Sequence, residues 1–113
     1  IKFLCSQKTA TMASGDTRNW IEEKIASNKV MMFSKSSCPF CTMAKKALDS
    51  CGIAYAVEEI EKRKDCSNIQ DTLCSMTKSR TVPQVFINGK YIGGGTETKA
   101  LADQGKLKAL VNG

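Results

Sequence analysis

The 113-residue sequence has no histidine, only two prolines, and aromatic residues that make up just 6% of the chain. Its longest apolar stretches, such as 30–33 and 53–57, fall far short of the roughly 18 residues that a membrane-spanning helix needs. It has no run of five lysines or arginines, and its few aromatics are scattered. We therefore expect no membrane segment and no recognisable nucleic-acid-binding module.

Size and composition indicate one globular domain. A second independent core would have too few residues to bury enough apolar surface. Hydrophobic residues make up 42% and charged residues 25% of the chain, as is usual for a packed protein. The net charge of +6 fits solubility alone as well as attraction to nucleic acid, an anionic surface or a small anionic partner.

Six cysteines in so short a chain could form the disulfide framework of a small secreted domain. The regular helix and strand pattern instead favours a reducing compartment, in which one cysteine pair is catalytic and the others are buried or incidental. Cys5 and Cys51 are interpreted as ordinary small residues rather than regulatory thiols. Between Cys66 and Cys74 no bond is predicted, because their spacing around a helix start leaves the geometry open.

Residues 1–13 contain two lysines, one serine, two threonines, no acid and no helical period. We expect a poorly ordered tail, with the domain spanning 14–113. The sequence does not begin with Met, and Met12-Ala13-Ser14 would make a plausible start, so the tail is interpreted as a presequence or a cloning remnant. Two lysines without arginine make a poor mitochondrial transit peptide, so we expect a cytoplasmic protein, or a mitochondrial one if the tail belongs to a presequence.

Hydrophobic periodicity and capping residues predict the order of the elements. Asp16 and Thr96 are the expected N-caps of the first and last helices. Asn88-Gly89 is the strongest two-residue hairpin signal and predicts an antiparallel pair. The three glycines 93–95 allow a close backbone approach, and Gly105 is a position where the last helix can break. The predicted elements are a helix (17–27), a buried strand (29–34), a helix (39–50), a strand (53–59), a helix (67–77), two strands (84–87 and 90–92) and a final helix from Thr96.

Cys38 and Cys41 stand where a predicted strand passes into a helix. A C-x-x-C motif beside a βαβ pattern is typical of a thioredoxin-like redox site. The alternatives are half of a zinc site or two buried small residues. Zinc would need two further ligands, but histidine is absent, and Cys66 and Cys74 have the wrong spacing for a second pair.

The position of Cys38 makes it the predicted nucleophile. It directly precedes Pro39, the expected first helical residue, so its sulfur can meet the free N–H groups and positive dipole of the helix. Lys35 adds a positive charge, and both features favour the thiolate, which is the attacking form. Cys41, about one turn further in, is more covered and is the predicted resolving cysteine.

Thr81-Val82-Pro83 directly precedes the hairpin. A proline there can simply mark the entry to a strand. A cis Val82–Pro83 bond would instead expose the backbone of Val82 to an extended peptide passing the thiolate. The residues alone leave both interpretations open.

These features resemble the glutaredoxin family over about residues 16–111. Thioredoxins look different, commonly with Trp before the first cysteine and Gly-Pro between the pair. The resemblance implies an α/β, thioredoxin-like fold with a four-stranded mixed sheet flanked by helices, a cis Pro83 and a glutathione groove beside Cys38. It is carried by Lys35-Ser36-Ser37-Cys38-Pro39-Phe40-Cys41, Thr81-Val82-Pro83-Gln84-Val85-Phe86-Ile87 and Gly93-Gly94-Gly95-Thr96-Glu97.

The resemblance also implies which residues meet glutathione. Lys35 and Gln70 would contact the glycine carboxylate, and Val82 the cysteinyl backbone. Thr96 and Glu97 would hold the γ-glutamyl end, although many members carry Asp where Glu97 stands. Members usually have Tyr where this chain has Phe40, and we expect little change in mechanism from its missing hydroxyl. The full implied set is Lys35, Gln70, Thr81, Val82, Pro83, Gly94, Thr96 and Glu97.

The implied activity is that of a glutathione-dependent thiol-disulfide oxidoreductase, reducing protein disulfides and glutathione mixed disulfides through Cys38 and Cys41. Glutathione is the expected co-substrate, with no permanently bound cofactor and no metal site. The expected partners are disulfide-bonded or glutathionylated proteins and, indirectly, glutathione reductase, and the chain is expected to be a monomer.

Two other functions are weighed. The first is a glutathione-ligated [2Fe-2S] cluster carrier or scaffold with Cys38 as a ligand. Relatives of that kind typically lack Pro39 or have only one cysteine. The second is a thioredoxin-type reductant fed by a reductase, which dependence on glutathione would distinguish.

Overall fold

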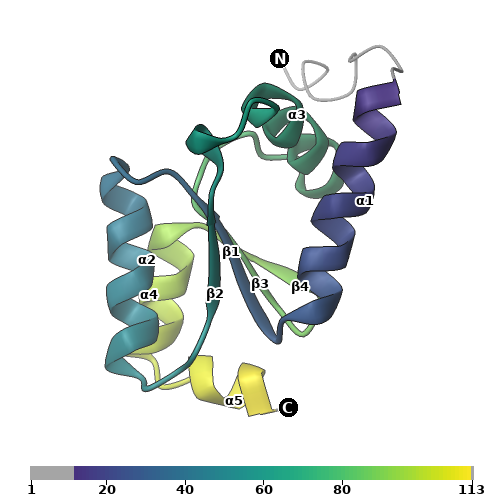
Figure 1. The fold of residues 1–113 in the computed structure, drawn as a ribbon. Helices are drawn as coiled ribbons and strands as arrows, with labels where there is room; N and C mark the ends of the chain where they lie inside the picture. Colours follow the sequence, from purple (N-terminus) through teal and green to yellow (C-terminus); the bar gives the residue numbers. More distant parts are fainter. Residues whose placement is uncertain (1–11, 113) are drawn as a thin grey trace.

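The structure is a computed structural model and describes residues 12–112. One sheet of four strands, in the order β2-β1-β3-β4, has helices on both faces (Figure 1). This confirms the predicted α/β fold. The elements in chain order are α1 (Met12–Ser27), β1 (Val30–Ser34), α2 (Pro39–Ser50), β2 (Ala56–Glu59), the 3₁₀ helix η2 (Ile60–Lys62), α3 (Cys66–Thr77), β3 (Gln84–Ile87), β4 (Lys90–Gly93), α4 (Gly95–Asp103) and α5 (Leu107–Asn112).

The sheet is mixed. Strand β1 pairs in parallel with β2, where Ser34 lies opposite Glu59, and antiparallel with β3. Strands β3 and β4 are antiparallel around the predicted Asn88-Gly89 turn. Both turn residues have positive φ angles, 52° and 84°, as a tight hairpin turn of this kind requires.

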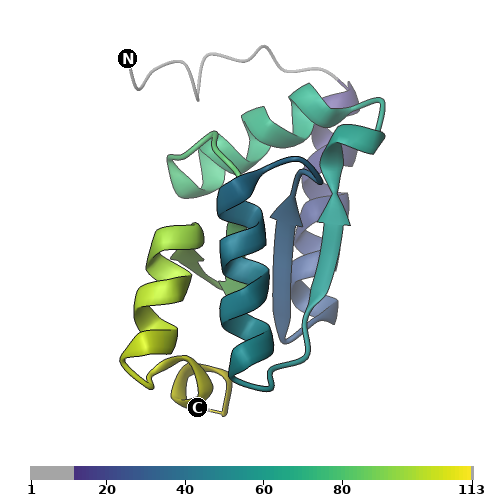
Figure 2. The ribbon, with the colours of Figure 1, turned by 90° about the vertical axis from the view of Figure 1, so that its left-hand side faces the viewer.

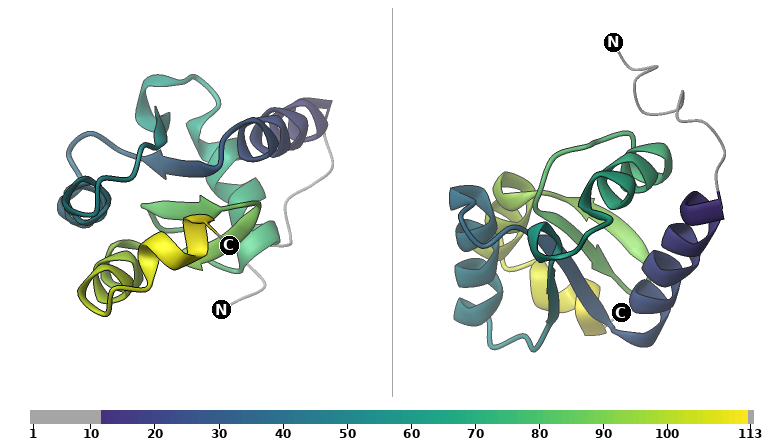
Figure 3. Two further views of the ribbon diagram at one scale, coloured as in Figure 1. Left: turned by 90° about the horizontal axis from the view of Figure 1, so that it is seen from below. Right: turned by 45° about the horizontal axis from the view of Figure 1, so that its top comes forward.

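Alternate residues of β1 face opposite sides of the sheet and build two cores. Val30 and Met32 pack with Leu48 of α2 on the face that α2, α4 and α5 cover (Figure 2). Met31 and Phe33 pack with residues of α1 and α3 on the other face, and the view from below separates these layers (Figure 3). Within residues 12–112, no helix is long and apolar enough to cross a membrane.

Helix α1, strand β2 and helix α4 do not begin at the residues that the sequence predicted. Helix α1 begins at Met12 rather than 17, so Asp16 lies inside it; Met and Ala favour helix and extend it upstream. Residues 1–11 of the predicted tail lie outside the described residues. Strand β2 begins at Ala56 rather than 53, because Ile53 enters the core from the loop after α2.

Helix α4 begins at Gly95 with Gly94 as N-cap, so Thr96 is not the cap. The Glu97 carboxylate accepts a hydrogen bond from the Gly94 N–H (2.8 Å), which is the contact that the third helical residue makes with the N-cap in a capping box. The predicted break at Gly105 is confirmed: Gly105 has a φ of 70° and separates α4 from α5.

Candidate active site

The site lies where the first turn of α2 meets the segment before β3 and the start of α4. Cys38 is the N-cap of α2 and Pro39 is its first residue, as the sequence predicted. The Cys41 N–H donates a hydrogen bond to Cys38 Sγ at 3.2 Å. The sulfur of Cys38 therefore sits at the positive end of the helix, where a thiolate is stabilised.

Val82 brings its backbone to the same sulfur. The Val82–Pro83 peptide bond is cis, which confirms what the family resemblance implied. Cys38 Sγ donates to the Val82 carbonyl oxygen at 3.6 Å. A ligand whose sulfur meets Cys38 therefore has the Val82 backbone directly beside it.

Cys41 has a different environment from Cys38. Its side chain is buried, with 1% of the residue exposed, whereas Cys38 is half-buried. Burial raises the pKa of the Cys41 thiol to about 11, and its hydrogen bond with Cys38 acts in the same direction. Hydrogen bonds with the Ser34 side chain and the Lys35 backbone oppose this shift. Cys41 is thus a buried, protonated thiol beside the more accessible thiol of Cys38.

A pocket of about 250 Å³ opens between Phe40, the segment before β3 and the start of α4. Lys35 and Gln70 are not among the described residues that line it. The Gln70 amide instead donates to the Arg80 carbonyl at 3.0 Å, and the Lys35 carbonyl accepts from the Cys38 N–H at 3.1 Å. The pocket gathers six of the eight predicted glutathione residues: Thr81, Val82, Pro83, Gly94, Thr96 and Glu97.

Gly95 fixes one wall of this pocket. A Cβ atom at this position would lie 2.4 Å from the carbonyl oxygen of Phe40. Only glycine therefore lets the start of α4 lie directly on the first turn of α2. This is the close backbone approach that the glycine run predicted.

The structure adds polar contacts around the site that the sequence interpretation did not include. The backbone N–H of Ser36 donates to the Glu61 carboxylate at 3.1 Å, and the Ser36 hydroxyl contacts the same oxygen. This ties the loop before Cys38 to η2. Lys45 of α2 pairs with Glu59 at the end of β2. Lys45 stands four residues after Cys41, a helical spacing that could have indicated their shared face.

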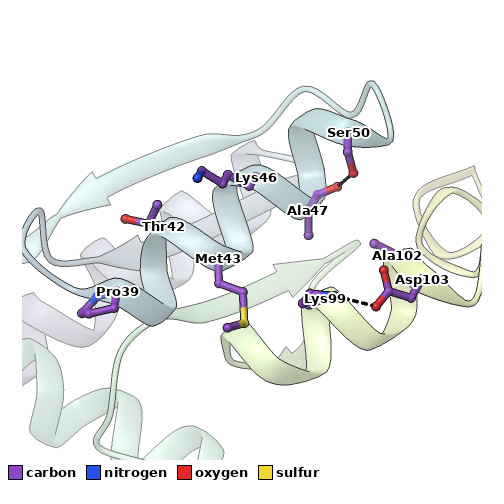
Figure 4. Close-up of a pocket in the computed structure, with 9 residues that line it drawn as sticks. All are labelled: Pro39, Thr42, Met43, Lys46, Ala47, Ser50, Lys99, Ala102 and Asp103. Carbon is purple, nitrogen blue, oxygen red and sulfur yellow. Dashed lines mark hydrogen bonds and ion pairs between the residues drawn. The ribbon is translucent and has the colours of Figure 1, made fainter.

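A larger groove of about 430 Å³ runs between α2 and α4, away from the predicted glutathione residues (Figure 4). Pro39 lies at one end, and Lys99 and Asp103 of α4 form an ion pair of 2.7 Å along it. It is lined by Pro39, Thr42, Met43, Lys46, Ala47, Ser50, Lys99, Ala102 and Asp103.

The remaining cysteines differ from one another. Cys51 and Cys66 are free thiols, whereas Cys74 is disulfide-bonded, a state that the sequence interpretation did not assign. Cys66 and Cys74 are therefore not bonded to each other, and Cys5 lies outside the described residues. Within residues 12–112, no three His, Cys, Asp or Glu side chains gather as a possible metal site.

Comparison with known proteins connects this geometry to a family. The glutaredoxin family model matches residues 30–92, more than half of the chain. Human mitochondrial glutaredoxin-2 is 46% identical over 94 residues, which cover 83% of this chain and 57% of the human protein. The chain thus spans little more than half the length of that relative.

Solved structures agree with the sequence matches. Oxidized glutaredoxin 2 from Chlamydomonas reinhardtii superimposes with a TM-score of 0.84 at 45% identity, covering 88% of this chain and 94% of that one. A buckwheat glutaredoxin-glutathione complex gives a TM-score of 0.85 at 33% identity, covering 91% and 94%. The chain belongs to the glutaredoxin family, whose members are thiol oxidoreductases.

Proposed function

We propose that this glutaredoxin is a glutathione-dependent oxidoreductase that reduces protein disulfides and protein-glutathione mixed disulfides. The observation that carries the proposal is the half-buried Cys38 sulfur at the N-terminus of α2, 3.2 Å from the Cys41 N–H. That position favours the thiolate, and the thiolate attacks disulfide sulfur.

The pocket beside Cys38 supports glutathione as the co-substrate. The backbone of Val82 can pair with an extended peptide, such as the cysteinyl part of glutathione. Thr96 and Glu97 lie in the first turn of α4, whose free N–H groups suit a carboxylate such as that of the γ-glutamyl end. Lys35 and Gln70 are proposed to meet the glycine carboxylate outside the pocket. The likeness to a buckwheat glutaredoxin solved with glutathione supports the same assignment.

The proposed reaction begins with attack of the Cys38 thiolate on the glutathione sulfur of a mixed disulfide. The substrate thiol leaves, and Cys38 is left bonded to glutathione. A second glutathione thiolate attacks this bond, forms oxidised glutathione and regenerates Cys38. With a protein disulfide, Cys41 instead attacks Cys38 and displaces the substrate, and two glutathione molecules then reduce the Cys38–Cys41 bond.

The test is glutathione-coupled reduction of a small mixed disulfide by the wild type and by Cys38→Ser, Cys41→Ser and Cys51→Ser proteins. Cys38→Ser should abolish turnover, because no other residue forms the covalent intermediate. Cys41→Ser should keep one-thiol turnover but lose reduction of protein disulfides. Cys51→Ser is the control for loss of a free thiol remote from the site, and it should behave as the wild type.

Retained turnover in the Cys38→Ser protein would contradict the proposal. An inactive wild type that forms a brown dimer after anaerobic reconstitution with iron and sulfide would instead support the [2Fe-2S] carrier. Turnover fed by a reductase without glutathione would support the thioredoxin-type alternative.

A further inference from the structure

A group of polar side chains lies beneath the two cysteines, on the side of the sheet that α2 covers. Ser34 and Glu59 are opposite each other in the parallel pairing of β1 with β2, so their side chains share a face. Met32 and Val57, two residues earlier on each strand, pack in the core under α2, which identifies that face. Ser34 is fully buried and hydrogen-bonds the Cys41 thiol.

Lys45 joins this group from α2. It lies four residues after Cys41, so both side chains are on one face of the helix. Its ammonium group is 2.7 Å from Glu59 Oε2, and the two side chains are only 27% and 23% exposed. The other oxygen, Glu59 Oε1, is buried and makes no hydrogen bond within residues 12–112. Glu59 therefore holds the partly buried Lys45 charge against the end of β2.

The next lysine in the helix has a different position. Lys46 is among the residues that line the groove between α2 and α4, and its side chain extends from α2 near Thr42 (Figure 4). The two lysines carry the same charge on the same helix, but only Lys45 belongs to the group with Cys41. They make a matched pair for experiment.

The pKa of Lys45 reflects the acidic groups around it. The hydrogen bond to Glu59 raises the pKa of Lys45, and its attraction to Glu59 and to an ionised Cys41 acts in the same direction. An ammonium one helical turn from Cys41 attracts a thiolate there, and this Coulomb attraction lowers the free energy of the ionised form. The titratable, charged or hydrogen-bonding groups around Cys41 and Lys45 are Cys38 of α2, Ser34 of β1, the Lys35 backbone, Glu59 of β2, and Tyr55 between α2 and β2.

We propose that Lys45, held by Glu59, is a positioning residue for the step in which Cys41 attacks the mixed disulfide on Cys38. This inference rests on the proposed function and concerns its two-thiol branch. In that step the Cys41 thiol loses its proton and forms a bond to Cys38 Sγ. The bond between Cys38 and glutathione breaks, and glutathione leaves as a thiolate that takes up a proton. No external oxidant or reductant is consumed.

Lys45 should favour the thiolate form of Cys41, because that thiol is buried and has a raised pKa. Half-buried Cys38 already lies at the N-terminus of α2. Loss of Lys45 should therefore slow the Cys41 step more than the one-thiol reaction, which uses Cys38 alone. The ratio of the two rates is the quantity that isolates the effect.

The experiment compares Lys45→Gln with Lys46→Gln. Each protein is converted to the Cys38-glutathione mixed disulfide with one equivalent of oxidised glutathione, and release of glutathione is followed by rapid quench between pH 6 and 9. One-thiol turnover of the same protein is the reference. In Lys45→Gln the ratio should fall by between about three- and tenfold, since one partly buried charge is lost. Lys46→Gln should leave the ratio unchanged, and Lys45→Arg should restore it.

A purely structural role would not move the pH profile, so the profile is the second readout. The rise of the Cys41 step with pH should shift to higher pH in Lys45→Gln and return in Lys45→Arg. Lys45→Met, which keeps the aliphatic stem, replaces Lys45→Gln if that protein lacks the wild-type circular dichroism.

Two results would overturn the inference: an unchanged ratio in Lys45→Gln, or an equal fall in Lys46→Gln, which would show a general charge effect. A wild type without any one-thiol turnover would contradict the proposed function instead, so the two failures are distinguishable.

Discussion

Raising the pH should reveal the buried state of Cys41, because this thiol has a pKa of about 11 instead of the ordinary 9.0. At pH 7 about one Cys41 side chain in ten thousand is then ionised, against about one in a hundred for an ordinary thiol. Alkylating reagents react with the thiolate, so Cys41 in the folded protein should react about a hundredfold more slowly than in the unfolded chain at pH 7.

The assay is labelling with iodoacetamide between pH 7 and 10 under reducing conditions. Cleavage after Lys35 and Lys45 yields peptide 36–45, which contains both cysteines, and tandem mass spectrometry assigns the label to Cys38 or Cys41. Labelling of Cys41 should rise about tenfold per pH unit across the whole range, without a plateau. The same protein in guanidinium chloride is the control, and there the rise should level off above pH 9.

The same shift predicts how stability depends on pH. The folded-state pKa lies above the unfolded value, so the protonated thiol stabilises the fold fully below pH 9, and this contribution is lost as the pH rises towards 11. A shift of two units corresponds to about 3 kcal/mol. A Cys41→Ala protein should lack this component of the alkaline loss. A plateau near pH 9 in the folded protein, or labelling as fast as in guanidinium chloride, would refute the reasoning.

Two further substitutions test the packing that positions the site. Gly95→Ala should lower the free energy of unfolding by about 1–3 kcal/mol, since its Cβ would lie 2.4 Å from the Phe40 carbonyl oxygen. Thermal melts measure this loss, with Lys99→Ala, which removes only an exposed ion pair on the same helix, as the control. Leu48→Ala should lower the free energy of unfolding in urea by about 2–5 kcal/mol, because Leu48 is fully buried. Leu110→Ala, at a leucine that is 41% exposed, should lower it by less than about 1 kcal/mol. Equal losses for a variant and its control, in either experiment, would contradict the packing described.

Local signals in the sequence predicted most of the fold. The apolar run of β1 predicted a buried strand, and every residue from Val30 to Ser34 is buried. Asn88-Gly89 predicted the hairpin because few other residue pairs accept positive φ at both positions. Cys38 before Pro39 predicted an N-terminal sulfur because proline begins helices. In each case the residues that determine the local structure are only a few positions apart in the sequence.

Contacts between distant segments could not be predicted in the same way. The glycine run indicated a close approach, but only the fold shows that Gly95 meets Phe40. Nothing near Ser36 in sequence points to Glu61, 25 residues later. The N-cap of α4 was misplaced for a related reason: Thr96 is the better capping residue by type, but Glu97 reaches back to Gly94 and moves the helix start.

Within one turn of helix the two cysteines have different environments: Cys38 is accessible at the N-terminus of α2, and Cys41 is buried. A short motif can therefore provide both thiols of a two-step reaction. Cys38 lies just outside α2 and meets its N–H groups, while Cys41 lies inside that turn and faces the sheet. From Cys38 to Cys41, three residues later, the sulfur thus moves from the N–H groups at the end of the helix to a buried position against the sheet. A resolving thiol that was always ionised would compete with the nucleophile for the same disulfides. Burial keeps Cys41 protonated in the resting protein, and a held cation such as Lys45 lowers the barrier to ionising it once Cys38 carries a disulfide.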